Sequence, residues 1–66
     1  MDWDRIKGNW KSFKGEAKQQ WGKLTDDDLE VIEGRREELE GKIQKRYGYA
    51  KDKARTEIDT WMNDNR

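Results

Sequence analysis

The chain has 66 residues, a mass of 8.0 kDa and equal numbers of basic and acidic residues, 15 of each, so its formal net charge is zero. Cysteine, histidine and proline are absent, which excludes disulfide bonds, zinc sites built from Cys or His, and catalysis by either of these residues. The length predicts one domain spanning residues 1–66. Because no apolar run is long enough to cross a membrane and residues 1–4 do not resemble a signal peptide, we expect a cytoplasmic protein.

Apolar residues are few but large. They make up 30% of the chain, against 45% for charged residues, and the mean hydropathy is −1.54. Four Trp, two Tyr and one Phe supply most of the apolar surface that could be buried. Because this surface must offset the conformational entropy of the whole chain, we expect a marginally stable protein whose order depends on conditions.

The first third of the chain has a helical pattern. Its large apolar residues recur at steps of three and four, which predicts one amphipathic helix over residues 3–22. The residues of this stripe are Trp3, Ile6, Trp10, Phe13, Ala17, Trp21 and Leu24.

A short second helix is expected over residues 26–33. Thr25 can cap its first turn, and the three aspartates that follow complement the helix dipole. Leu29 and Ile32 are its apolar residues, and Gly34 is the expected C-terminal cap.

Two further helices are expected over residues 35–47 and 49–63, separated by Gly48. No stretch alternates with a period of two, so the predicted fold class is all-α, a small four-helix domain. One shared core is expected from the large apolar residues Trp3, Ile6, Trp10, Phe13, Trp21, Leu29, Ile32, Leu39, Ile43, Tyr47, Ile58 and Trp61.

The sequence also contains an apparent internal repeat at an offset of 26 residues. Under this shift three glycines coincide with three others, Gly8, Gly15 and Gly22 with Gly34, Gly41 and Gly48. Two similar helical units packed against each other, or a coincidence in a chain of simple composition, both account for the pattern.

Charge is segregated along the chain although its total is zero. Residues 1–23 carry six bases and three acids, residues 24–40 two bases and eight acids, and residues 41–66 seven bases and four acids. The acidic middle segment either docks between the two basic segments, or leaves a basic surface open to an anionic partner.

Four lysines, Lys7, Lys11, Lys14 and Lys18, lie at helical spacing beside the tryptophans of the first helix. Basic residues interleaved with aromatic ones can bind nucleic acid through phosphates and stacked bases. A solvated helix face accounts for the same pattern, because the aromatic residues are needed in the core. These lysines are the candidate contacts to an anionic partner.

No residues point to catalysis, a cofactor or a metal. The acidic run Asp26, Asp27 and Asp28 lacks the spacing of a calcium loop and is typical of a helix start. The serine and threonines have no histidine to activate them, and the glycines lack the context of a phosphate-binding loop. We therefore expect a protein that is not an enzyme and has no small-molecule substrate.

Several motifs spread over nearly the whole chain are similar to those of one known family. They are WDRIKGNWK at residues 3–11, FKG at 13–15, KQQWGKLTDDDL at 18–29, GRREELEGKIQ at 34–44 and RYGY at 46–49. With these motifs the chain resembles the CsbD-like family of bacterial general stress response proteins. The resemblance implies a small cytoplasmic protein without an assigned activity, folded as two helical hairpins packed crosswise.

Two functions follow from these patterns. The first is a stress-induced, hydrophilic protein with a protective or structural role, because such a charged surface keeps the chain soluble as water is withdrawn. The alternative is a nucleic-acid- or protein-binding module that uses the basic face of the first helix.

Overall fold

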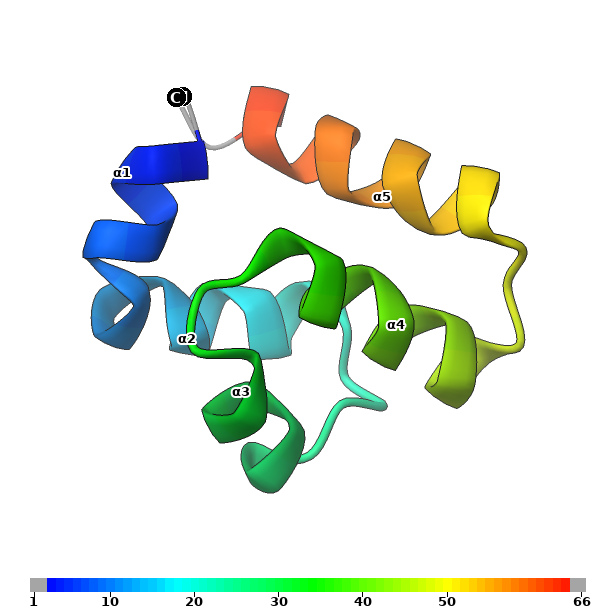
Figure 1. Cartoon of the computed structure of the whole chain (residues 1–66), viewed down its shortest axis with the longest axis horizontal. Helices are drawn as coiled ribbons and strands as arrows, with labels where there is room; N and C mark the ends of the chain where they lie inside the picture. Colours follow the sequence, from blue (N-terminus) through cyan, green and yellow to red (C-terminus); the bar gives the residue numbers. More distant parts are fainter. Residues whose placement is uncertain (1–2, 65–66) are drawn as a thin grey trace.

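Five helices make up the fold in residues 3–64, the part of the chain that the computed structural model describes (Figure 1). They are α1 (Trp3–Gly8), α2 (Trp10–Gln20), α3 (Asp26–Ile32), α4 (Arg36–Tyr47) and α5 (Lys51–Asp64). No strand occurs within residues 3–64, so the predicted all-α class is confirmed. None of the helices found there is both long and apolar enough to cross a membrane.

The prediction of one helix over residues 3–22 is wrong at Asn9, which separates α1 from α2. Asn9 departs from helical geometry with φ −122° and ψ 33°. Its side-chain Nδ2 donates to the carbonyl of Arg5 at 3.0 Å, the same oxygen that its backbone N–H contacts at 3.1 Å. An asparagine side chain that bonds to the backbone in this way competes with the regular hydrogen bonds of a helix. The preceding residue, Gly8, favours a helix only weakly, so the helix breaks easily here. The chain therefore turns a corner between α1 and α2 (Figure 1).

The start of α3 is confirmed as predicted. The hydroxyl of Thr25 accepts a hydrogen bond from the backbone N–H of Asp28 at 3.0 Å. In return the Asp28 carboxylate accepts one from the backbone N–H of Thr25 at 3.1 Å, which completes a capping box.

The end of α3 lies one residue earlier than expected, because Glu33 and not Gly34 is its cap. Both residues are in the left-handed region, with φ of 49° and 79°. Gly34 allows the backbone of α1 to approach closely, because a Cβ at this position would lie 2.9 Å from the Cα of Lys7. Its carbonyl also accepts a hydrogen bond from the indole N–H of Trp3 at 2.7 Å. This glycine therefore holds α1 against the α3–α4 connection.

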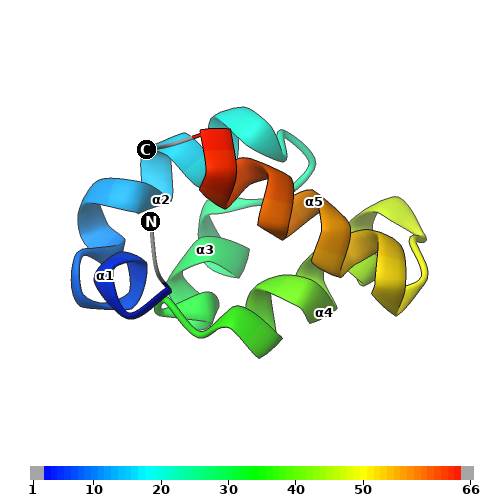
Figure 2. The same ribbon diagram turned by 90° about the horizontal axis from the view of Figure 1, so that it is seen from above.

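Helices α4 and α5 lie side by side and run in opposite directions (Figures 1 and 2). Gly48 ends α4 in the left-handed region at φ 71°, as expected, and its N–H donates to the carbonyl of Gln44 at 2.9 Å. α5 begins at Lys51, two residues later than predicted. The arrangement of four helices as two crosswise hairpins is not confirmed, since residues 3–64 form five helices.

The core joins all five helices. Its buried members are Ile6, Trp10, Ala17, Trp21, Leu24, Leu29, Ile32, Leu39, Ile43, Ala54, Ile58 and Trp61. Of the predicted core, Trp3, Phe13 and Tyr47 are only partly buried and pack against this cluster. The core prediction is thus confirmed for the other nine residues, and Ala17, Leu24 and Ala54 complete the buried cluster.

Trp61 of α5 is the centre of the aromatic contacts. Its ring meets those of Trp3, Phe13 and Trp21 edge to face, with ring centres 6.5, 6.3 and 5.2 Å apart. These contacts join α5 to α1, to α2 and to the residue that caps α2. Trp10 is fixed separately, because its indole N–H donates to the carbonyl of Leu29 at 2.9 Å.

Candidate functional site

Two of the four candidate lysines are engaged within the fold. Lys14 Nζ lies 2.5 Å from Glu30 Oε1, and Lys18 Nζ lies 2.7 Å from Asp26 Oδ1, so α2 faces the acidic α3. The hydrogen bond and charge of Lys18 lower the pKa of Asp26. The expectation that the acidic segment docks on a basic one is confirmed at these pairs.

The other two lysines, Lys7 and Lys11, are exposed. Neither forms an ion pair with any residue in the described part of the chain. Lys7 lines a shallow hollow of about 340 Å³ beside Trp3, together with acidic and basic side chains. The candidate basic face is therefore reduced to two free cations at the corner between α1 and α2.

A buried carboxylate, Asp28, links α3 to α4. Arg46 approaches it with both Nε and Nη2, at 2.7 and 3.1 Å, and Lys42 Nζ lies 3.8 Å away. The Arg46 guanidinium and the capping contacts with Thr25 hold the pKa of this carboxyl well below its usual range. Asp28 therefore caps its own helix and pairs with the next one.

A second buried carboxylate, Glu40 of α4, faces α5. Its two oxygens lie 3.3 Å from Arg36 Nε and 3.4 Å from Arg55 Nε. Arg36 also reaches Asp59 on α5 with Nη2 at 2.6 Å. These contacts form a charged network that spans α4 and α5.

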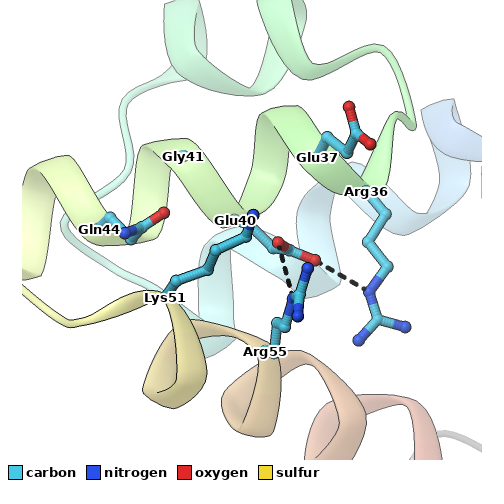
Figure 3. Close-up of a pocket in the computed structure, with 7 residues that line it drawn as sticks. All are labelled: Arg36, Glu37, Glu40, Gly41, Gln44, Lys51 and Arg55. Carbon is cyan, nitrogen blue, oxygen red and sulfur yellow. Dashed lines mark hydrogen bonds and ion pairs between the residues drawn. The ribbon is translucent and has the colours of Figure 1, made fainter.

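The network borders a cleft of about 540 Å³ between α4 and α5 (Figure 3). The lining residues are Arg36, Glu37, Glu40, Gly41, Gln44, Lys51 and Arg55. In the close-up, Arg36 and Arg55 converge on Glu40, while Lys51 extends from the start of α5 towards α4. A cleft with three cations and two carboxylates can hold small polar groups, but it presents no nucleophile beside a base.

The described residues offer no arrangement for a metal ion. Within residues 3–64 no group of three or more acidic side chains is placed to coordinate one. The run Asp26 to Asp28 disperses instead, because Asp26 turns to Lys18 and Asp28 to Arg46. The capping box of Thr25 and Asp28 supports the interpretation of these residues as a helix start.

Sequence reasoning missed a cluster at the connection between α4 and α5. Tyr47 and Tyr49 stack with their ring centres 5.2 Å apart, and Lys23 and Lys53 lie over the rings. The motif RYGY was visible in the sequence, but Lys23 is distant along the chain and has no periodic relation to it. The pairs Arg46–Asp28 and Arg55–Glu40 were missed for the same reason.

Comparison with known proteins places the chain among relatives of similar length. The CsbD-like family matches residues 4–56. The UPF0337 protein RPA4217 of Rhodopseudomonas palustris is 69% identical over 62 residues, which cover 94% of each chain. The UPF0337 proteins YjbJ of Escherichia coli K12 and Salmonella typhimurium are 58% and 60% identical over 65 residues, which cover 98% of this chain and 94% and 93% of theirs. The chain therefore belongs to the CsbD-like family.

Proposed function

We propose that this protein is a non-enzymatic stress protein of the cytoplasm that protects other macromolecules through weak contacts of its charged surface. The observation that carries the proposal is the division between core and surface. Among the described residues, Val31 is the one large hydrophobic residue that is exposed, at 49%, whereas charged residues make up 45% of the chain. Membership of the CsbD-like family, a general stress response family, supports the same role.

Such a surface suits a protein that must stay dissolved at high concentration. Large exposed apolar patches drive association, and the described surface carries none built from several large hydrophobic residues. Many surface charges are already paired within the fold, as in Lys14–Glu30, Lys18–Asp26 and Arg36–Asp59. Contacts with other molecules would therefore be weak and numerous, because each one competes with an internal pair or with water.

The absence of a catalytic role is part of the proposal. The sequence contains neither histidine nor cysteine, and the carboxylate in the cleft, Glu40, is engaged by two arginines. No side chain there is positioned as an activated nucleophile.

Protection of a labile enzyme tests the proposed function. The enzyme is dried or heated with an equal mass of this protein, and its residual activity is compared with that in the presence of serum albumin. We expect more activity to survive with this protein than with albumin. Single variants such as Lys11→Gln should protect as well as the parent, because the effect is spread over the surface. Protection no better than that of albumin contradicts the proposal.

The alternative is binding of nucleic acid or protein by the basic face of the first helices. It is supported by the exposure of Lys7 and Lys11, and weakened by the pairing of Lys14 and Lys18 with α3. A gel shift at low salt tests it with nucleic acid. If this face binds phosphates, Lys7→Gln and Lys11→Gln each reduce the slope of log affinity against log salt by about 0.7–0.9. An unchanged slope in both variants rules this face out.

A further inference from the structure

Two stacked tyrosines lie between two lysines at the connection from α4 to α5. The planes of Tyr47 and Tyr49 are inclined by 26°, with ring centres 5.2 Å apart. Lys23 Nζ lies 5.1 Å from the ring centre of Tyr47, and Lys53 Nζ lies 4.5 Å from that of Tyr49. Both rings are half-buried, whereas both lysines are exposed. We call these four residues the tyrosine–lysine cluster.

The backbone holds this cluster in place. The Tyr47 hydroxyl accepts a hydrogen bond from the backbone N–H of Lys23 at 3.3 Å, which ties the α2–α3 connection to the end of α4. Gly48 adopts φ 71°, a conformation that side chains disfavour, and so allows the chain to turn between the two tyrosines. Three segments of the chain therefore hold the cluster in place: the α2–α3 connection, the end of α4 and the connection from α4 to α5.

Positive charge gathers around the cluster. Residues 41–56 contain six bases and one acid, Asp52. Three of these bases pair with buried carboxylates: Lys42 and Arg46 share Asp28, and Arg55 contacts Glu40. The local excess therefore comes from the remaining cations.

Those remaining cations are Lys45, Lys51 and Lys53, to which the fold adds Lys23 of the cluster. None of the four forms an ion pair with any side chain that the structure describes, those of residues 3–63. The connection between α4 and α5 lies at the opposite end of the molecule from α1 (Figures 1 and 2). The longest dimension of the molecule is 27 Å, several times the Debye length of about 8 Å at physiological salt, so charges at the α1 end do not cancel this charge, and Asp52 within the segment offsets one of the four cations.

We propose that the tyrosine–lysine cluster binds single-stranded nucleic acid, with one base stacked on the outer face of Tyr49. In the free protein Lys53 covers that face through a cation–π contact. A base stacks on an aromatic ring more strongly than an exposed ammonium contacts it, so the base displaces Lys53. The ammonium then moves to a neighbouring phosphate, and Lys23 on the other side takes a second one.

This geometry favours single strands over duplexes. In a duplex the faces of the bases are already stacked and cannot reach a protein ring without being extruded. A flexible single strand offers both an open base and adjacent phosphates. The inference concerns a surface distinct from Lys7 and Lys11, and it is independent of the proposed protective role.

Fluorescence anisotropy with the full chain and a labelled oligothymidylate of about 16 nucleotides tests the proposal. We expect the single strand to bind at low salt about tenfold or more tighter than a duplex of the same length. Tyr49→Leu should weaken binding about 5- to 150-fold, the range for the loss of one stacked base, whereas Tyr49→Phe should retain it. Lys23→Gln and Lys53→Gln should each reduce the salt slope by about 0.7.

Two controls separate stacking from charge and from unfolding. Arg35→Gln removes an exposed charge next to Gly34, away from the cluster, and should leave single-strand binding unchanged, whereas Lys11→Gln tests whether the candidate face of the first helices binds instead. Circular dichroism checks that each variant is folded, and the exposed Lys23 and Lys53 variants keep the test valid if Tyr49→Leu unfolds.

Several results would overturn the proposal. One is the absence of single-strand binding at protein concentrations up to about 100 µM, the weak limit for non-specific complexes. Equal affinity for the duplex, or equal competition by inorganic polyphosphate of the same charge, would leave no role for base stacking. Unchanged affinity in a folded Tyr49→Leu variant, or a loss of salt slope in Lys11→Gln alone, would place the binding surface elsewhere.

Discussion

Replacing Trp10 by alanine should unfold the protein. Trp10, the first residue of α2, is 9% exposed in the hydrophobic core, and its indole N–H donates to the carbonyl of Leu29 at 2.9 Å. Truncation of a buried tryptophan costs about 3–5 kcal/mol through lost burial and the cavity left behind. The Leu29 carbonyl keeps its hydrogen bond from the backbone N–H of Glu33 at 3.4 Å, so the lost indole hydrogen bond adds only about 0.5–1.5 kcal/mol. A core of this size rarely supplies more than about 3–5 kcal/mol of net stability, so the variant should lose its fold at room temperature.

Circular dichroism melts and urea titrations of the variant beside the parent measure this effect. Trp10→Phe is the matched control, because it keeps an aromatic ring in the core but removes the indole N–H that donates to the Leu29 carbonyl. We expect Trp10→Phe to remain folded with a lower midpoint, and Trp10→Ala to show no cooperative transition. If Trp10→Ala melts at the temperature of the parent, Trp10 does not belong to a stabilising core and the reasoning fails.

Three further predictions concern the buried ion pair and the close glycine contact. Asp28→Asn should lower the urea midpoint clearly more than the exposed control Asp27→Asn, because Arg46 then lacks its charged partner; equal midpoints would contradict this. Contacts with Arg46 depress the pKa of Asp28 in the folded protein. The stabilisation from these contacts is therefore complete above the pKa of an unfolded aspartate, about 3.9, and is lost as the pH falls below that value. Below this pH the urea midpoint should drop more steeply for the parent than for Asp28→Asn. Gly34→Ala should destabilise by about 1–3 kcal/mol in a urea titration, because of its positive φ and its approach to Lys7. Gly15→Ala, in open space within α2, should instead stabilise by about 0.5–1 kcal/mol, and a similar loss in both glycine variants would refute the argument.

The sequence predicted the core well because burial follows a local period. Steps of three and four residues place apolar side chains on one face of a helix, and this face is buried whichever other helix packs against it. This rule also explains the missed break at Asn9, since Ile6 and Trp10 keep a step of four across the corner and both are buried. A hydrophobic period alone therefore could not distinguish one helix from two, and the signal was the competing side chain of Asn9.

The charged contacts could not be predicted in the same way. Arg46 is 18 residues from Asp28, and Arg55 is 15 residues from Glu40, so their pairing depends on how the helices pack. The candidate lysines illustrate the limit. Helical spacing predicted that Lys14 and Lys18 lie on one face, but it could not predict that α3 packs opposite that face. Whether Lys7 and Lys11 bind an anionic partner stays a prediction.

The edge-to-face contact between Trp3 and Trp61 has a consequence for folding kinetics. Most helical proteins fold quickly because their contacts are local in sequence. Here α1 and α5 must meet across almost the whole described chain before the aromatic cluster can form. The entropic cost of closing such a loop grows only slowly with its length, about 0.6 kcal/mol for each doubling, so the barrier stays modest. The rate of folding should therefore respond to substitutions at Trp61 if the closure precedes the transition state, while the rate of unfolding should respond if it follows.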